Sequence, residues 1–209
     1  MNSRRIWLAS SNPGKLRELE QAARPEGIEA SGHVLEVALL PDFDRLSKCE
    51  EDAATFLGNA LRKALHYGRF REGLVIAEDS GLVVDALGGE PGVRSARYAE
   101  PDASDEANNR KLLAALSAVP EEKRTARYVC VLVAVERGEP LAIFSDSCQG
   151  RITREPRGRG GFGYDPVFFY PPLGRTFGEV AETDLGLKNQ HSHRGKAFRK
   201  LVAFLEGRL

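Results

Sequence analysis

The feature that most constrains the fold is residues 74–87, LVIAEDSGLVVDAL, in which two short apolar runs flank two adjacent acidic residues. The runs at 74–77 and 82–84 predict two buried strands, with Glu78 to Gly81 as an acidic turn between them. Two neighbouring carboxylates are costly to bury unless a cation or a set of hydrogen-bond donors compensates them. The stretch therefore indicates either a metal site or a polar turn whose Asp and Ser side chains bond their own backbone.

The length and charge of the chain limit the classes of protein it can be. At 209 residues it is long enough to bury a substantial core, and we expect one domain of two lobes over residues 1–209. Its 30 Lys and Arg residues balance 30 Asp and Glu residues, whereas binders of nucleic acid or of membrane surfaces usually carry a basic excess. We therefore expect neither nucleic acid nor a membrane as a partner.

The cysteines indicate a reducing environment. Cys49, Cys130 and Cys148 form no CxxC motif and no zinc-like spacing with histidine, so neither a disulfide framework nor a structural zinc site is predicted. The apolar run near the amino terminus is too short for a signal peptide, and no segment approaches the length of a membrane span. We expect a cytoplasmic protein.

The first part of the chain has the pattern of a phosphate-binding loop. Residues 5–9 predict a strand, and the loop SSNPGK at 10–15 leads directly into helical spacing. A strand, a glycine-containing loop and a helix in this order direct backbone N–H groups toward one place, which favours phosphate, and Lys15 adds a positive charge. The alternative is that residues 10–12 cap the helix and Pro13 begins its first turn.

The region 27–67 predicts a short strand, an irregular acidic loop and then a helix from Thr55 to Tyr67. The acidic residues 50–52 stand just before that helix. Negative charge at this position suits the helix dipole, but the same residues are equally candidates for metal ligands.

The middle of the chain predicts a loop at 86–98, a helix from Asp105 to Ala118 that Ser104 opens, and a long β-hairpin. The hairpin strands are expected at 126–135 and 141–148.

The turn of this hairpin is predicted at Gly138 to Pro140. A loop of those three residues would bring Cys130 opposite Cys148, but we expect no disulfide in a reducing cell.

Residues 160–165, GGFGYD, precede a predicted strand at 167–170. A glycine-rich loop that holds aromatic residues and one Asp is able to form a planar slot, because aromatic rings stack on bases and a carboxylate accepts a hydrogen bond from a base N–H. The alternative is a tight loop in which Phe162 and Tyr164 fill the core.

Residues 188–194, KNQHSHR, gather hydrogen-bond donors directly before a predicted amphipathic helix. A metal role for His191 and His193 would need further ligands that the neighbouring sequence lacks. The segment indicates either hydrogen bonding to an oxygen-rich ligand or a solvated helix cap.

Five motifs, taken in order and at their spacings, resemble the Ham1/inosine triphosphatase family of non-canonical purine nucleoside triphosphate pyrophosphatases. They are SSNPGK, EDSGL, ALGGEPGVRSARY, GGFGYDPVF and KNQHSHRGKA, and the resemblance runs from about residue 6 to about residue 203. It implies a mixed α/β fold with a long central mixed sheet flanked by helices, two lobes and a nucleotide cleft. It also implies a cytoplasmic, Mg²⁺-dependent homodimer that hydrolyses ITP, dITP and XTP to the monophosphate and pyrophosphate.

The family's functional residues transfer to matching positions of this chain. The substrate-binding residues are expected to be Ser10, Ser11, Asn12, Pro13, Gly14, Lys15, Ser80, Phe162, Gly163, Tyr164, Asp165, Lys188, His193 and Arg194. The catalytic residues are expected to be Asp79, Glu78 and Lys15, and the metal ligands Asp79 and Glu51. Two departures stand out: Ala53 and Gly58 replace residues common in the family, and the chain looks a few residues longer between Gly174 and Lys188.

The resemblance implies that Mg²⁺, held by Asp79 with Glu51 or Glu78, stabilises charge while water attacks the α-phosphorus and pyrophosphate leaves. An ordinary Asp has a pKa of about 3.9, and metal contact lowers it. We therefore expect Asp79 to be a metal ligand that orients the water, with Glu78 as the alternative base.

Base selection is expected to depend on hydrogen-bond donors. Hypoxanthine and xanthine carry the acceptor O6 where adenine carries an amino group, so donors from Lys188, His193 and Arg194 would be left unpaired by adenine.

Two other classes of protein remain as alternatives. A nucleotide-binding module without hydrolysis would use the same pocket, and an α/β scaffold protein would use the glycine loops only structurally. Among enzymes, the Maf-type pyrophosphatases are the nearest alternative, and the SHRG segment at 192–195 favours the Ham1 family.

Overall fold

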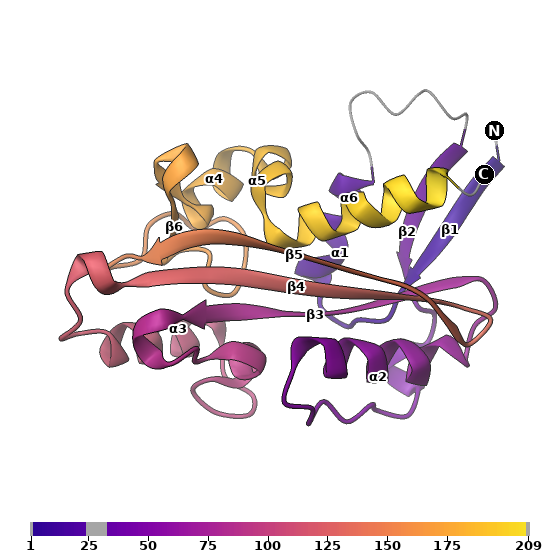
Figure 1. Ribbon diagram of the computed structural model, residues 1–209, viewed down its shortest axis with the longest axis horizontal. Coiled ribbons are helices and arrows are strands. Elements are labelled where there is room, and N and C mark those ends of the chain that lie inside the picture. Colours follow the sequence, from indigo (N-terminus) through magenta and orange to yellow (C-terminus); the bar gives the residue numbers. More distant parts are fainter. Residues whose placement is uncertain (1, 24–32, 208–209) are drawn as a thin grey trace. The chain divides into compact units, whose positions relative to one another are not determined.

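A computed structural model describes residues 2–23 and 33–207 (Figure 1). The helices are α1 (Pro13–Ala22), α2 (Phe56–Gly68), α3 (Asp105–Ala115), α4 (Phe177–Thr183), α5 (Leu185–His191) and α6 (His193–Glu206). The strands are β1 (Asn2–Leu8), β2 (His33–Leu39), β3 (Leu74–Val84), β4 (Thr125–Glu136), β5 (Glu139–Ile152), β6 (Phe168–Tyr170) and β7 (Arg175–Thr176). None of the helices within these residues is long and apolar enough to cross a membrane.

The described strands hydrogen-bond in one sheet in the order β2-β1-β3-β4-β5-β6-β7. Strand β1 pairs in parallel with β2 and β3, whereas β6 pairs in antiparallel with β5 and β7. The sheet is therefore mixed, which confirms the predicted mixed α/β class.

The chain divides into two compact units. Unit 1 comprises the described parts of residues 1–79, 130–146 and 194–209, and unit 2 comprises residues 80–129 and 147–193. That the whole chain is one domain stays a prediction.

The core of unit 1 lies on both faces of its strands. Leu74 and Ile76 of β3 pack in one apolar cluster with α1 and α6, whereas Val75 and Ala77 pack in a second cluster with α2. Successive side chains of a strand point to opposite faces, so this alternation assigns each helix to one side of the sheet (Figure 1). The prediction that helices flank the sheet is confirmed within this unit.

The core of unit 2 is rich in aromatic side chains. Tyr128 of β4, Phe168 of β6 and Phe177 of α4 lie in one buried cluster, with ring centroids 4.6 Å apart for Tyr128 and Phe168 and 5.2 Å apart for Phe168 and Phe177. Leu112 of α3 packs in the same cluster, so this unit holds its own core.

The predicted acidic turn at Glu78 to Gly81 is wrong, because β3 runs without a break from Leu74 to Val84. The sequence pattern predicted two strands because the apolar run stops at the charged residues 78 and 79, where a buried strand is expected to end. In the structure each carboxylate stays in the strand because cations on its own side of the sheet compensate it, as described below.

The hairpin turn is shorter than predicted. Strand β4 ends at Glu136 and β5 begins at Glu139, leaving Arg137 and Gly138, with φ of 55° and 79°. Two residues with positive φ form the turn whose twist matches that of hairpin strands. The three-residue loop that would bring Cys130 opposite Cys148 is therefore wrong, and none of the three cysteines, all of them described, forms a disulfide.

The predicted helices at the start of the chain, at 55–67 and at 105–118 are confirmed as α1, α2 and α3, although α3 ends at Ala115. The segment 188–194 differs from expectation. Residues 188–191 form the end of α5, and α6 begins at His193 after a break at Ser192.

The buried side chain of Phe198 on α6 gives a test of this packing. It is 0% exposed in the cluster shared with β1 and β3. Phe198→Ala should lower the free energy of unfolding by about 3–5 kcal/mol, because it removes buried apolar surface and leaves a cavity. Urea denaturation measures this loss. Phe70→Ala, at a side chain 42% exposed, should cost less than about 1 kcal/mol, and equal losses would contradict the assigned core.

Candidate functional site

The loop 10–15 is built as a helix cap. Asn12 Oδ1 accepts hydrogen bonds from the backbone N–H groups of Gly14, at 2.8 Å, and Lys15, at 3.2 Å, and Pro13 occupies the first turn of α1. Ser10 Oγ accepts from the backbone N–H of Asn12 at 3.1 Å. The capping interpretation is therefore confirmed for Asn12 and Pro13. The backbone N–H groups of Gly14 and Lys15, which were expected to face a phosphate, donate to Asn12 instead. The ammonium of Lys15 is therefore the group of this loop that remains to attract a phosphate.

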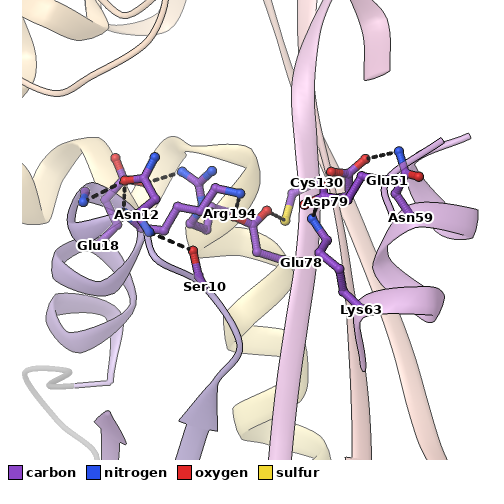
Figure 2. A network of polar contacts seen from close by, with 12 residues as sticks. Ser10, Asn12, Glu18, Glu51, Asn59, Lys63, Glu78, Asp79, Cys130 and Arg194 are labelled. Carbon is purple, nitrogen blue, oxygen red and sulfur yellow. Dashed lines mark hydrogen bonds and ion pairs between the residues drawn. The ribbon is translucent and has the colours of Figure 1, made fainter. Parts of the chain in front are cut away.

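Glu78 is 2% exposed and lies in a cluster of buried charges on the side of β3 that faces α1 and α6 (Figure 2). Its Oε1 is 2.9 Å from Lys15 Nζ and accepts from Arg194 Nε at 3.2 Å. The thiol of Cys130 on β4 donates to Oε2 at 3.5 Å.

Arg194 extends this cluster, because its Nη1 also donates to Glu18 on α1. Glu18 is itself 2% exposed. Arg194 therefore joins α6 to α1 and to β3 through two buried carboxylates.

The charges around Glu78 hold it ionised. Burial alone would raise its pKa, but Arg194, Lys15 and Lys63 outweigh burial and hold the pKa of Glu78 well below its usual range. A carboxylate with a depressed pKa is a weak proton acceptor, which argues against Glu78 as the alternative base.

Asp79 lies on the opposite face of β3, toward α2 (Figure 2). Its Oδ1 accepts from Lys63 Nζ at 3.2 Å and its Oδ2 from Asn59 Nδ2 at 3.3 Å. The ammonium of Lys63 also donates to Glu51 Oε2 at 2.7 Å, so one cation bridges the two predicted metal ligands.

Burial raises the pKa of Asp79, and Glu78 raises it further, against the opposing effect of Lys63 and Lys15. For Lys63, burial lowers the pKa, but Asp79 and Glu51 outweigh burial and raise it. The lysine is therefore charged, and Asp79 is the more basic of the two adjacent carboxylates.

The carboxylates of this site fit a Mg²⁺ ion that is bound by only one or two protein ligands. The pleat of β3 directs Glu78 and Asp79 to opposite faces, so these two carboxylates do not share one ion. No group of three or more His, Cys, Asp or Glu residues that could hold a metal occurs within residues 2–23 and 33–207. Asp79 and Glu51 remain as a pair, and Mg²⁺ in proteins commonly binds one or two carboxylates together with substrate phosphates and water. Glu50 is exposed.

In unit 2 the loop 160–165 is organised around Asp165, which is 2% exposed. Its Oδ2 accepts from the backbone N–H of Phe162 at 2.9 Å and also from Lys188 Nζ, and its Oδ1 accepts from Tyr128 Oη at 3.4 Å. Gly161 has a φ of 74°, and a Cβ there would lie 2.0 Å from Asp165 Oδ2. The compact loop therefore requires glycine at this position.

Aromatic rings surround these polar groups. Lys188 Nζ lies 5.2 Å from the centre of the Phe162 ring, and the His193 ring stacks on Tyr128 with centroids 4.6 Å apart and an angle of 3° between planes. Tyr164 is different, because it is buried in the core and its Oη donates to Ser95 O at 2.8 Å. For Tyr164 the core-filling interpretation is confirmed, whereas Phe162 is half-buried.

The predicted site residues are divided between the two units. Unit 1 holds Ser10, Ser11, Asn12, Pro13, Gly14, Lys15, Glu51, Glu78, Asp79 and Arg194, and unit 2 holds Ser80, Phe162, Gly163, Tyr164, Asp165, Lys188 and His193. The side chain of Arg194, which was expected with the base-binding residues, contacts Glu78 and Glu18, and its role toward the base stays a prediction.

The sequence interpretation missed Lys63, Asn59 and Glu18. Asn59 and Lys63 are four residues apart on α2, next to Ala60 and Ala64 of its apolar face. Polar residues at helical spacing on the edge of a buried face are the signal that would have identified Asn59 and Lys63. No comparable local signal marks Glu18, whose partner Arg194 is 176 residues away.

Comparisons with known proteins agree on one family. The model of the Ham1 family matches residues 6–204. A dITP/XTP pyrophosphatase of Desulforamulus reducens is 44% identical over 201 residues, covering 96% of this chain and 95% of the relative. A dITP/XTP pyrophosphatase of Geobacillus kaustophilus is 47% identical over 196 residues, covering 94% and 91%.

Solved structures show the same likeness. The Ham1 protein of Staphylococcus aureus matches with a TM-score of 0.80 at 35% identity, covering 99% of this chain and 100% of that one. A Ham1 protein of Coxiella burnetii matches with a TM-score of 0.79 at 38% identity, covering 97% and 98%. The resemblance inferred from the five motifs is confirmed.

The depressed pKa of Glu78 gives a pH test. Its contribution to stability is fully present above the ordinary Glu pKa of 4.5 and is lost as the pH falls from there through the folded-state value. Glu78→Gln should lower the free energy of unfolding at pH 7 by about 3–5 kcal/mol, because Lys15 and Arg194 lose a buried counter-charge. It should also make stability fall less steeply below pH 4.5 than in wild type.

Urea denaturation at several pH values measures both effects. Glu106→Gln is the matched control, since that side chain is 84% exposed, and it should follow the wild-type pH curve. Parallel pH curves for Glu78→Gln and wild type would contradict the assignment of the charge cluster.

Proposed function

Because the chain belongs to the Ham1 family, we propose that it hydrolyses the non-canonical purine nucleoside triphosphates ITP, dITP and XTP to the nucleoside monophosphate and pyrophosphate. The observation that carries this proposal is the 44% and 47% identity, over nearly the whole chain, to two relatives named dITP/XTP pyrophosphatase. Removal of deaminated purines from the nucleotide pool is the role that follows from this reaction.

Unit 1 is the part of the chain suited to the triphosphate. Lys15 and Lys63 each carry an ammonium group within reach of a buried carboxylate of β3. Lys15 is the more accessible, with 19% of its side chain exposed against 8% for Lys63. We assign Lys15 to phosphate binding, where its charge offsets that of the substrate.

Asp79 and Glu51 are the residues that would hold Mg²⁺, which would supply the positive charge that stabilises the triphosphate and the leaving pyrophosphate. Lys63 binds both carboxylates, and Asn59 binds the second oxygen of Asp79. These contacts fix the direction of Asp79 before any ligand arrives, which reduces the cost of reorganisation.

We assign Asp79, rather than Glu78, to hold the metal ion and to orient the attacking water. The side chain of Asp79 is 11% exposed against 1% for Glu78, and Lys63 joins it to the more exposed Glu51. Glu78 is tied to Lys15 and Arg194, and its role is to hold these two cations in place.

Unit 2 is the part of the chain suited to the base. Lys188 and His193 are hydrogen-bond donors beside the ring of Phe162 and the ring of Tyr128, respectively. Donors facing O6 of hypoxanthine or xanthine would meet the amino group of adenine in ATP and be left unpaired, which lowers its affinity. Arg194 is outside this assignment because it binds Glu78 and Glu18.

The decisive experiment is pyrophosphate release from ITP, XTP, GTP and ATP, with and without Mg²⁺. We expect Mg²⁺-dependent release from ITP and XTP, reduced at least about 100-fold in Asp79→Asn, because an amide is a poorer ligand for Mg²⁺ than a carboxylate. Asp85→Asn is the matched control, since this exposed Asp binds Thr125 and Arg127, and it should keep wild-type activity.

The other outcomes separate the alternatives. Binding of ITP without release from any substrate would favour a nucleotide-binding module. Equal release from ITP and ATP would contradict the selection at O6.

We also propose that the protein is a cytoplasmic homodimer that binds a small nucleotide rather than nucleic acid, as the family resemblance implies. Light scattering during size-exclusion chromatography should therefore give twice the mass of one chain. A monomer mass at micromolar concentration would contradict the homodimer.

A further inference from the structure

Helix α3 holds both backbone groups of Gly163, a residue of the loop 160–165. The N–H of Gly163 donates to Asp105 Oδ2 at 2.6 Å, and its carbonyl accepts from Asn109 Nδ2 at 2.8 Å. Asp105 and Asn109 are four residues apart, so they lie on the same face of α3. We call this pair the α3 clamp.

The clamp complements a second attachment of the same loop. The N–H of Gly160 donates to the carbonyl of Gly178 at 3.1 Å, and the N–H of Gly178 donates to the carbonyl of Asp165 at 2.8 Å. A Cβ at Gly160 would lie 2.1 Å from the backbone N of Glu182, so the ends of the loop pack directly on α4. Helix α4 thus holds the two ends of the loop, and the clamp holds Gly163 in its middle.

The conformation at Gly163 needs such support. Its φ is 63°, and a Cβ there would meet nothing within 4 Å, so close packing of neighbouring atoms does not hold this peptide in place. Glycine has the largest backbone freedom to lose, and both hydrogen bonds of the clamp oppose that freedom. Phe162 precedes Gly163 directly, so the orientation of its ring depends on the clamped peptide.

The orientation of Asn109 is determined by its partners. Its Nδ2 donates to two carbonyl oxygens, of Gly163 and of Asp105, at 2.8 and 2.9 Å, which excludes an exchange of the amide N and O. Its Oδ1 is buried and has no hydrogen-bond partner within the described part of the chain. A buried acceptor without a partner costs stability, so Asn109 is not the residue that stability alone would select.

We propose that Asp105 and Asn109 are positioning residues that set the affinity for the purine base by fixing the peptide groups of Gly163. The inference rests on the proposed function, and it assigns to α3 an indirect part in base recognition, through the loop 160–165.

The test replaces Asn109 with Leu, which has the same branched arrangement of side-chain heavy atoms and removes both the clamping donor and the unpartnered acceptor. We expect the KM for ITP to rise about tenfold, equivalent to one buried hydrogen bond, with kcat changed less than about twofold. Inhibition by tripolyphosphate, which carries no base, should stay within about twofold of wild type, and the thermal midpoint should stay within about 2 °C.

A second variant avoids the buried site. Asp105 is exposed, so Asp105→Ala should fold normally and raise the KM for ITP about threefold. Asp105→Asn keeps an acceptor for the N–H of Gly163 and should recover most of that loss. Arg110→Ala on the exposed side of α3, which breaks only the pair with Glu106, should leave both KM and kcat unchanged.

Three outcomes would overturn the inference. An unchanged KM in Asn109→Leu and Asp105→Ala would show that the clamp does not affect the base. A parallel loss of ITP affinity, tripolyphosphate inhibition and thermal stability would show a merely structural role. A wild-type protein that neither binds nor hydrolyses ITP would remove the proposed function and this inference together, whereas an active wild type with unaltered variants would remove the inference alone.

Discussion

The structure of unit 1 depends on the pleat of β3 at two adjacent carboxylates. Because neighbouring residues of a strand face opposite sides, Glu78 is directed toward α1 and α6 and Asp79 toward α2. A buried carboxylate without a partner is strongly unfavourable, so each side needs its own cations. Lys15 and Arg194 supply them on one side and Lys63 on the other. The three helices are thus tied to the strand by charge as well as by apolar packing.

The opposite directions of Glu78 and Asp79 also separate two roles that the sequence alone does not divide between these residues. Glu78 is fully enclosed by two cations and a thiol, which suits a residue that holds Lys15 and Arg194 in fixed positions. Asp79 shares Lys63 with the less buried Glu51, which under the proposed function suits a residue that meets water and a metal ion. Under the function proposed for this member of the Ham1 family, the fixed cations would bind the triphosphate and the more accessible carboxylate would hold the metal ion.

The main structural requirement in unit 2 is to keep the glycine-rich loop 160–165 in one conformation. Glycines at 160 and 161 permit close approach to α4 and to Asp165, but such residues lose much backbone freedom on folding. The loop is therefore held by hydrogen bonds from two helices, and Asp165 is held in turn by Phe162, Lys188 and Tyr128. Under the proposed function, rigidity in this loop would let hydrogen bonds discriminate between bases, because a mobile donor or acceptor would adapt to either.

The sequence by itself determined the local elements and the family. Helical spacing identified α1, α2 and α3, the capping role of Asn12 followed from residue type, and five motifs at their spacings identified the Ham1 likeness. Only the tertiary structure decided that Glu78 and Asp79 lie within one strand, that Arg194 binds Glu78, and that Lys63 bridges Asp79 and Glu51. The reason is physical: whether a buried charge is tolerated depends on partners that are distant in the chain, 116 residues away for Arg194 and Glu78, and local patterns carry no record of them.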